Sequence, residues 1–110
     1  MNWKIFTHIS LLLIAVFFSR LSSADTTWID VRSKIEHRFD SIEGDIRISY
    51  GDIVEELSEM FPDKSTEIRL YCRSGGRAEK AMSALKEAGY TKVSNVGSID
   101  EARKERGLSE

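Results

Sequence analysis

Short apolar runs alternate with stretches of helical periodicity from residue 25 to the end of the chain. Short runs rich in Ile, Val, Leu and aromatic residues are typical of buried strands. Apolar residues that recur every three or four positions indicate an amphipathic helix. The pattern predicts four strands, at residues 27–31, 46–48, 67–72 and 92–96. It predicts a helix after each strand, at residues 33–39, 49–61, 77–88 and 98–107.

Residues with end-capping chemistry mark several of the predicted helix boundaries. Ser33 and Glu36 have the spacing of a capping box, in which each side chain accepts a hydrogen bond from the backbone amide of the other. Ser49 is placed to cap the second helix, and Pro62 ends it because proline has no backbone N–H. Gly89 is a natural end for the third helix, since glycine readily adopts the left-handed conformation of a C-terminal cap.

The regular alternation of strand and helix sets the expected fold class. Connections of this length join parallel strands through right-handed helical crossovers, so helices cover both faces of the sheet. We therefore expect an α/β fold with a small, open parallel sheet of four to five strands. Ligands bind such sheets just beyond the carboxyl ends of the strands. Cys72, the only cysteine, ends the third predicted strand and lies at that edge.

The first 24 residues differ in composition from the rest of the chain. Lys4 precedes an apolar run at residues 9–18, and Ser22, Ser23 and Ala24 supply the small residues of a cleavage site. This is the layout of a secretory signal peptide. An uncleaved membrane anchor is the alternative, but a bilayer span needs about 20 apolar residues. We therefore predict a cleaved signal peptide at residues 1–24 and one small domain at residues 25–110.

Charge and cysteine content exclude some classes of function. Two of the 16 Lys and Arg residues, Lys4 and Arg20, lie in the predicted signal, whereas all 18 Asp and Glu residues lie beyond it. The mature chain therefore carries a net charge of about −4, which argues against a surface for nucleic acid or anionic membranes. A single cysteine makes no intramolecular disulfide, so an exported chain with this composition suggests a reactive thiol or intermolecular pairing.

The residues after Cys72 favour a reactive thiolate. Gly75 and Gly76 allow the backbone amides of the turn to curl around the sulfur, and the following helix directs its positive end at the same point. Arg73 and Arg77 add two full charges suited to binding an oxyanion. In such settings the pKa of cysteine falls from about 8.5 to roughly 3.5–7.5. Cys72 is therefore the candidate nucleophile, and an inert buried thiol is the alternative.

A thiolate that is already ionised attacks without a neighbouring general base. Of the two histidines, His8 lies in the predicted signal and His37 in the first helix. Because His37 lies between two charged residues, we expect it to be simply an exposed helix residue.

Four segments carry a resemblance to a known family. They are Ile29–Arg32, Ile42–Ile48, Tyr71–Arg77 and Val96–Ile99, whose order and spacing cover nearly the whole predicted mature chain. Together they resemble the single-domain rhodanese-like sulfurtransferases. With the predicted signal peptide, the chain is similar to the exported thiosulfate sulfurtransferases of the phage-shock E type.

The resemblance implies a set of roles. Cys72 would be the nucleophile that takes a sulfane sulfur from thiosulfate, and cyanide or another thiophile would accept it. Asp30 and Arg32 match the first signature of the family and would support the active site. Donor and persulfide would be held by the turn itself, comprising Arg73, Ser74, Gly75, Gly76 and Arg77. The signal peptide and the resemblance together imply a periplasmic location. We also expect no cofactor and no metal, a monomer, and no stable membrane association after signal cleavage.

Loop length separates two chemistries in this family. Sulfurtransferases count six residues from the cysteine to the end of the loop, as Cys72 to Arg77 do here, whereas related phosphatases and arsenate reductases count seven. A non-catalytic persulfide carrier or redox-sensing module remains the main alternative, and a phosphatase or arsenate reductase is the third. The chain departs from the family at Ser41–Asp45, where His-Ile-Pro-Gly-Ala is usual, and at Ala102, where a Trp is common.

Overall fold

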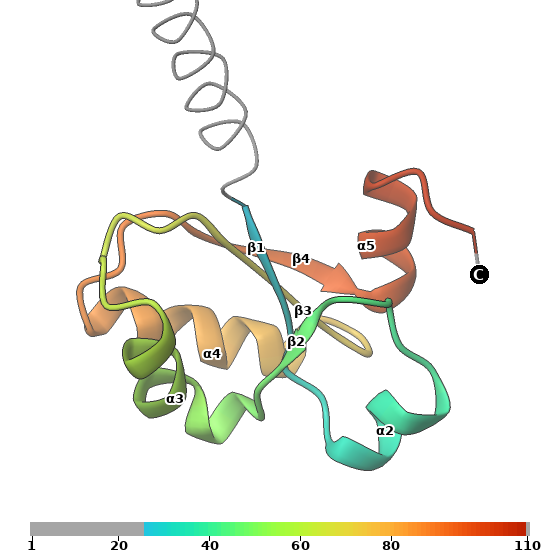
Figure 1. Ribbon diagram of the computed structural model, residues 1–110, viewed down its shortest axis with the longest axis horizontal. Coiled ribbons are helices and arrows are strands. Elements are labelled where there is room, and N and C mark those ends of the chain that lie inside the picture. Colours follow the sequence, from blue (N-terminus) through green and yellow to red (C-terminus); the bar gives the residue numbers. More distant parts are fainter. Residues whose placement is uncertain (1–25, 110) are drawn as a thin grey trace, which may run out of the picture.

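The strands form one parallel sheet in the computed structural model, which describes residues 26–109 (Figure 1). The predicted signal peptide at residues 1–24 lies outside the described residues. The sheet has the order β2-β1-β3-β4, and every neighbouring pair is parallel. The strands are β1 (Thr27–Asp30), β2 (Ile46–Arg47), β3 (Ile68–Cys72) and β4 (Val93–Ser98). The helices are α2 (Lys34–Phe39), α3 (Ile53–Met60), α4 (Gly76–Glu87) and α5 (Ile99–Glu105).

Helices cover both faces of the sheet, as the alternating pattern predicted. On one face, α3 and α4 pack on the strands through a fully buried apolar cluster that includes Ile29, Leu57, Leu70 and Leu85. On the other face, α5 covers a smaller cluster of Ile42, Tyr71, Ile99 and Ala102. Figure 1 shows α3 and α4 on the opposite side of the strands from α5. The expected α/β class, with a parallel sheet of four strands, is confirmed.

Side-chain caps begin two of the helices, but the cap expected at a third helix does not form. Ser33 and Glu36 form a complete capping box at α2, and an equivalent box begins α5. Ser49 does not cap the second helix: a short 3₁₀ turn, η1 (Tyr50–Asp52), comes before α3. The Ser49 hydroxyl instead accepts a hydrogen bond of 2.9 Å from Arg47 Nη1. Local spacing therefore predicted this helix but not the way in which it begins.

The short helix α2 differs from the others because none of its residues is buried. Its apolar side chains, Ile35 and Phe39, are 67% and 84% exposed. Figure 1 shows α2 beyond the end of β1, set apart from the layers formed by the other helices. Polar contacts rather than apolar packing therefore hold α2 in place, and several of these contacts converge on the candidate site. Within residues 26–109, no helix has the length and apolar character to cross a membrane.

Candidate active site

Cys72 ends β3, an inner strand, and its side chain faces the core beneath the turn that leads to α4. The residue is only 1% exposed. The backbone N–H of Gly75 donates a hydrogen bond of 2.9 Å to Cys72 Sγ. Gly75 has a φ of +97°, and a Cβ added there would lie 3.4 Å from the Cα of Gly97. The backbone angle favours glycine at this position, whereas the contact with β4 is an ordinary van der Waals distance that would admit a Cβ.

The surroundings of Cys72 lower the pKa of its thiol. Burial raises this pKa, but hydrogen bonds from the backbone amides of Ala78, Ser74, Gly75 and Arg77 outweigh burial, and the net shift is downward. These amides belong to the turn and to the first residues of α4, whose N-terminus also carries a partial positive charge. The site thus favours the thiolate, which is the nucleophilic form of cysteine.

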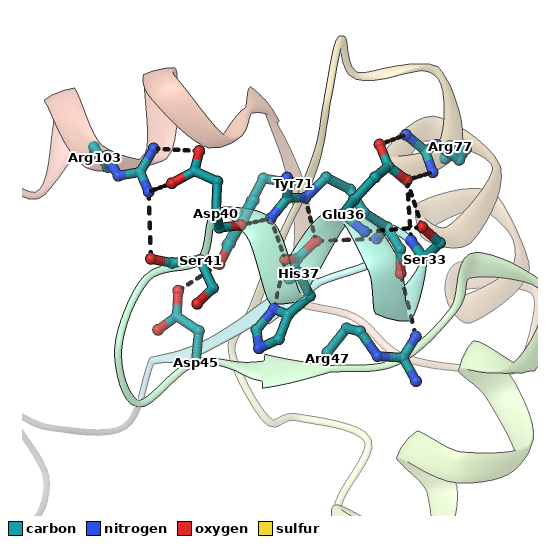
Figure 2. A network of polar contacts seen from close by, with 12 residues as sticks. Ser33, Glu36, His37, Asp40, Ser41, Asp45, Arg47, Tyr71, Arg77 and Arg103 are labelled. Atoms are coloured by element: carbon teal, nitrogen blue, oxygen red, sulfur yellow. Dashed lines mark hydrogen bonds and ion pairs between the residues drawn. The ribbon is translucent and has the colours of Figure 1, made fainter. Parts of the chain in front are cut away.

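Arg77 lies on the first turn of α4, and its guanidinium forms an ion pair with the carboxylate of Glu36 in α2. The pair is bidentate, with Nη1–Oε1 and Nη2–Oε2 distances of 2.6 and 2.9 Å (Figure 2). The hydrogen bond from Arg77 lowers the pKa of Glu36 to about 2, against an ordinary value of 4.5. Glu36 also completes the capping box with Ser33. One carboxylate therefore joins the N-terminus of α2 to the cysteine turn.

Arg73, the residue directly after Cys72, is exposed and has a different environment from Arg77. Among residues 26–109, no carboxylate forms an ion pair with Arg73. Its side chain lines an open cleft of about 360 Å³ that also borders Ile35 and Phe39 of α2. Both arginines were predicted to bind an anion. In the structure, the Arg77 guanidinium is paired with Glu36, whereas the Arg73 guanidinium remains available to bind an anion.

Asp30 and Arg32 form a buried ion pair at the end of β1. Arg32 donates from Nε and Nη2 to the two carboxylate oxygens of Asp30 at 2.9 and 2.8 Å. Burial raises the pKa of Asp30, but hydrogen bonds from Arg32 and His37 outweigh it and hold that pKa below its usual value. Arg32 also donates to the backbone carbonyl of Asp40. The pair therefore anchors both ends of α2 to the sheet.

The prediction that His37 is simply an exposed helix residue is wrong. Its side chain is 29% exposed, and Nδ1 lies 2.9 Å from Asp30 Oδ2. Because a carboxylate only accepts hydrogen bonds, Nδ1 carries the hydrogen. The reason is tertiary: α2 lies beyond the end of β1 (Figure 1), and the fold brings the His37 ring within hydrogen-bond distance of the buried Asp30 carboxylate. His37 contacts Asp30 rather than Cys72, so it supports the scaffold of the site.

Asn95 of β4 is a supporting residue that sequence reasoning missed. Its Nδ2 donates to the carbonyl of Gly75 at 3.0 Å, and its Oδ1 accepts from the amide of Gly97 at 2.9 Å. Asparagine is depleted in strands, so an Asn inside a predicted strand was a signal that could have been followed. Glu36 was recognised as a cap, but its contact with Arg77 spans 41 positions of sequence and has no local signature.

The two departures from the family pattern have structural roles of their own. Asp45 accepts hydrogen bonds from the hydroxyl of Tyr71 at 2.7 Å and from both terminal nitrogens of Arg106. Ala102 is fully buried against Tyr71 in the cluster under α5. Within residues 26–109, no group of three or more potential ligands is placed to hold a metal ion.

The fold and the site together define a class. It comprises small, open α/β domains in which a single thiol, hydrogen-bonded by backbone amides, ends an inner parallel strand. The chain belongs to the rhodanese-like domain family, whose model matches residues 16–105.

Relatives and solved structures agree with this assignment. The chain is 34% identical over 89 residues to the thiosulfate sulfurtransferase PspE of Escherichia coli K12, covering 81% of this chain and 86% of the relative. It is 32% identical over 92 residues to the tRNA uridine(34) hydroxylase of Enterobacter sp. strain 638, but covers only 26% of that protein. A solved Escherichia coli rhodanese with anions is 32% identical, with a TM-score of 0.66 over 69% of this chain and 89% of that one. These relationships support sulfurtransferase activity for this chain.

Proposed function

We propose that the protein is a thiosulfate sulfurtransferase that carries sulfur on Cys72 and passes it to cyanide or another thiophilic acceptor. The observation that supports this most directly is the thiol of Cys72, whose pKa is lowered by backbone amides of the turn. The relationship to PspE, which is a thiosulfate sulfurtransferase by name, supports the choice of donor.

The proposed reaction has two displacements. The Cys72 thiolate attacks the outer sulfur of thiosulfate, the S–S bond of thiosulfate breaks, and sulfite leaves with the bonding electron pair. Cys72 then carries a persulfide whose terminal sulfur is negatively charged and can be held by the amides of the turn. Cyanide attacks that terminal sulfur, the S–S bond to Cys72 breaks, and thiocyanate leaves while Cys72 regains its thiolate. The enzyme is unchanged after each cycle.

The geometry supports separate roles for the two arginines of the turn. Arg73 is the cation that receives the dianionic donor, because it is exposed beside Cys72. Arg77 contributes its backbone amide to the sulfur, while its guanidinium holds Glu36 and fixes the turn against α2. Ser74 contributes its amide, and Gly75 and Gly76 shape the loop. Asp30 and Arg32 hold the scaffold beneath.

The test is to incubate the protein with thiosulfate and record its intact mass. We expect a gain of one sulfur atom that maps to Cys72, followed by release of thiocyanate when cyanide is added. Cys72→Ser should show neither signal, whereas Met60→Ser, which changes an exposed side chain at the end of α3, should keep both. A wild-type protein with neither a mass gain nor thiocyanate would exclude the proposal.

A persulfide carrier with negligible turnover is the second candidate, and the burial of Cys72 is the observation that favours it. A carrier would gain the sulfur but release thiocyanate only once per molecule, so steady turnover decides between the two. Aryl phosphate hydrolysis that depends on Cys72 would instead indicate a phosphatase.

We also propose export to the periplasm after removal of residues 1–24, on the basis of the composition of this segment. Cell fractionation followed by N-terminal sequencing of the mature chain tests this. Recovery of the intact chain in the cytoplasm would contradict it.

A further inference from the structure

We propose that Asn95 of β4 is a positioning residue for sulfur transfer at Cys72. Its side-chain amide holds the carbonyl of Gly75, so that the N–H of the same glycine stays directed at the Cys72 sulfur. Asn95 acts through Gly75 and makes no bond to sulfur. The inference rests on the proposed function of Cys72, and it adds to that function a residue from a different strand.

The first observation is that both ends of the Asn95 amide are in use. Nδ2 donates to the carbonyl oxygen of Gly75 at 3.0 Å and to Glu79 Oε2 at 3.2 Å. Oδ1 accepts from the N–H of Gly97 at 2.9 Å. Because carbonyls and carboxylates only accept hydrogen bonds and a backbone N–H only donates, the three partners need a side chain that donates at one atom and accepts at another. An amide meets this need, whereas the ionised Asp side chain, which has the same shape, only accepts.

The second observation is that Gly75 contacts the sulfur on one side and Asn95 on the other. Its N–H donates to Cys72 Sγ at 2.9 Å. Its carbonyl accepts from Asn95 Nδ2 and also from the backbone N–H of Glu79 in α4. Since glycine has few steric barriers to backbone rotation, hydrogen bonds must hold Gly75 at its φ of +97°. Asn95 supplies one of these bonds from outside the turn and α4.

The third observation is a bulge in β4 beside the turn. Asn95 and Gly97 lie opposite consecutive residues of β3, so Val96 is the extra residue. Bulges re-aim side chains and are over-represented next to active sites. At this bulge, Asn95 Oδ1 accepts from the backbone N–H two residues on, which is the contact of an Asx turn. That contact alone would serve only β4, but Nδ2 of the same side chain reaches across to Gly75.

The position of the Gly75 N–H matters for the charge on the thiol. Burial raises the pKa of Cys72, and hydrogen bonds from backbone amides, that of Gly75 among them, outweigh burial. The charged groups near the thiol are the guanidiniums of Arg73 and Arg77, the second of which is paired with Glu36. If the side-chain contact on the carbonyl of Gly75 is removed, its N–H is free to turn away, and the thiolate loses a hydrogen-bond donor.

The test follows the ionisation of Cys72 through the ultraviolet absorbance of its thiolate, with Cys72→Ser as the blank. We expect Asn95→Ala to move the midpoint to higher pH. The acid dissociation constant should fall about tenfold, which is the scale of a weakened hydrogen bond to a charged group. Ser94→Ala, at the exposed neighbouring position of β4, should keep the wild-type midpoint. A lower Tm in Asn95→Ala with an unchanged midpoint would show a purely structural role and overturn the proposal.

A second variant, Asn95→Asp, separates the two halves of the contact. An ionised Asp still accepts from the N–H of Gly97 but cannot donate to Gly75, so the bond within β4 is kept and the bond to the turn is lost. The added charge is screened in about 1 M salt, where the Debye length is about 3 Å. In that salt the midpoint should rise as in Asn95→Ala. A wild-type midpoint in Asn95→Asp would overturn the proposal even if Asn95→Ala did not fold.

Sulfur loading gives a further readout in a single turnover with excess thiosulfate. At a pH below both midpoints, Asn95→Ala should load Cys72 about tenfold more slowly than the wild type, because only the thiolate attacks. Well above both midpoints the two rates should be nearly equal, and equal rates at every pH would contradict the role of Asn95. A wild type that does not load at all would exclude the proposed function alone, because the absorbance titration needs no sulfur donor and still decides the role of Asn95.

Discussion

Within the described residues, the Glu36–Arg77 pair is the only side-chain ion pair between α2 and the cysteine turn. Removing it therefore tests whether this contact stabilises the fold. Glu36→Gln keeps the size of the side chain and its ability to complete the capping box with Ser33, but it removes the charge. The two side chains are 27% and 30% exposed, so water screens part of the attraction. We expect a loss of about 1–2 kcal/mol of unfolding free energy for this bidentate, partly exposed pair. In a domain of this size, each kcal/mol lowers Tm by about 4–8 °C.

The pH dependence of this loss has a defined sign. The pKa of Glu36 is held near 2 in the folded protein and has an ordinary value of 4.5. A depressed pKa contributes stability that is complete above the unfolded pKa and is lost as pH falls through the folded value. The wild-type advantage over Glu36→Gln should therefore be full at neutral pH and vanish between about pH 4.5 and pH 2. Thermal melts of both proteins across this range measure it.

A double-mutant cycle separates the pair from other effects of the substitution. Arg77→Gln keeps the backbone amide that contacts the cysteine sulfur while removing the guanidinium. If the pair stabilises the protein, the double variant should lose clearly less than the sum of the two single losses. Additive losses, or a Glu36→Gln protein with the wild-type Tm at pH 7, would refute the role assigned to this contact.

Three further predictions concern the thiol, a glycine and the buried carboxylate. The rate of alkylation of Cys72 should rise with pH around a pKa below about 8.5, the value for a free cysteine. A rate profile with its midpoint at or above that value would contradict the lowered pKa of Cys72. Gly97→Ala should destabilise the protein by about 1–3 kcal/mol, because φ is +106° and the new Cβ would lie 1.8 Å from the carboxylate that caps α5. Denaturant titration measures this loss, with Gly51→Ala, where no atom lies within 4 Å, as the near-neutral control. Asp30→Asn should cost about 3–5 kcal/mol, because it leaves the buried guanidinium of Arg32 without its counter-charge, and a loss below 1 kcal/mol in the same titration would show that the pair is dispensable.

Much of the fold could be read from the sequence because its signals are local. Strand and helix periodicities placed every strand and α-helix of the described residues within a few residues but missed the 3₁₀ turn η1, and the Ser33 box formed as its spacing predicted. The errors also have physical causes. The Ser49 hydroxyl accepts a hydrogen bond from Arg47 instead of capping a helix. The His37 ring forms a hydrogen bond with the buried carboxylate of Asp30, seven positions earlier. In both cases the polar side chain forms a hydrogen bond with a partner that only the folded structure reveals.

The cysteine turn shows the same division. The sequence by itself determined that a single thiol would end a parallel strand, followed by two glycines, two arginines and a helix. These features depend on residues only a few positions apart, and their local conformational preferences are similar whatever the rest of the chain does. Only the tertiary structure decided how the two arginines differ. Glu36 reaches Arg77 across 41 positions and leaves Arg73 at the open cleft, since ion pairing depends on which segments the fold brings together rather than on which residues are adjacent.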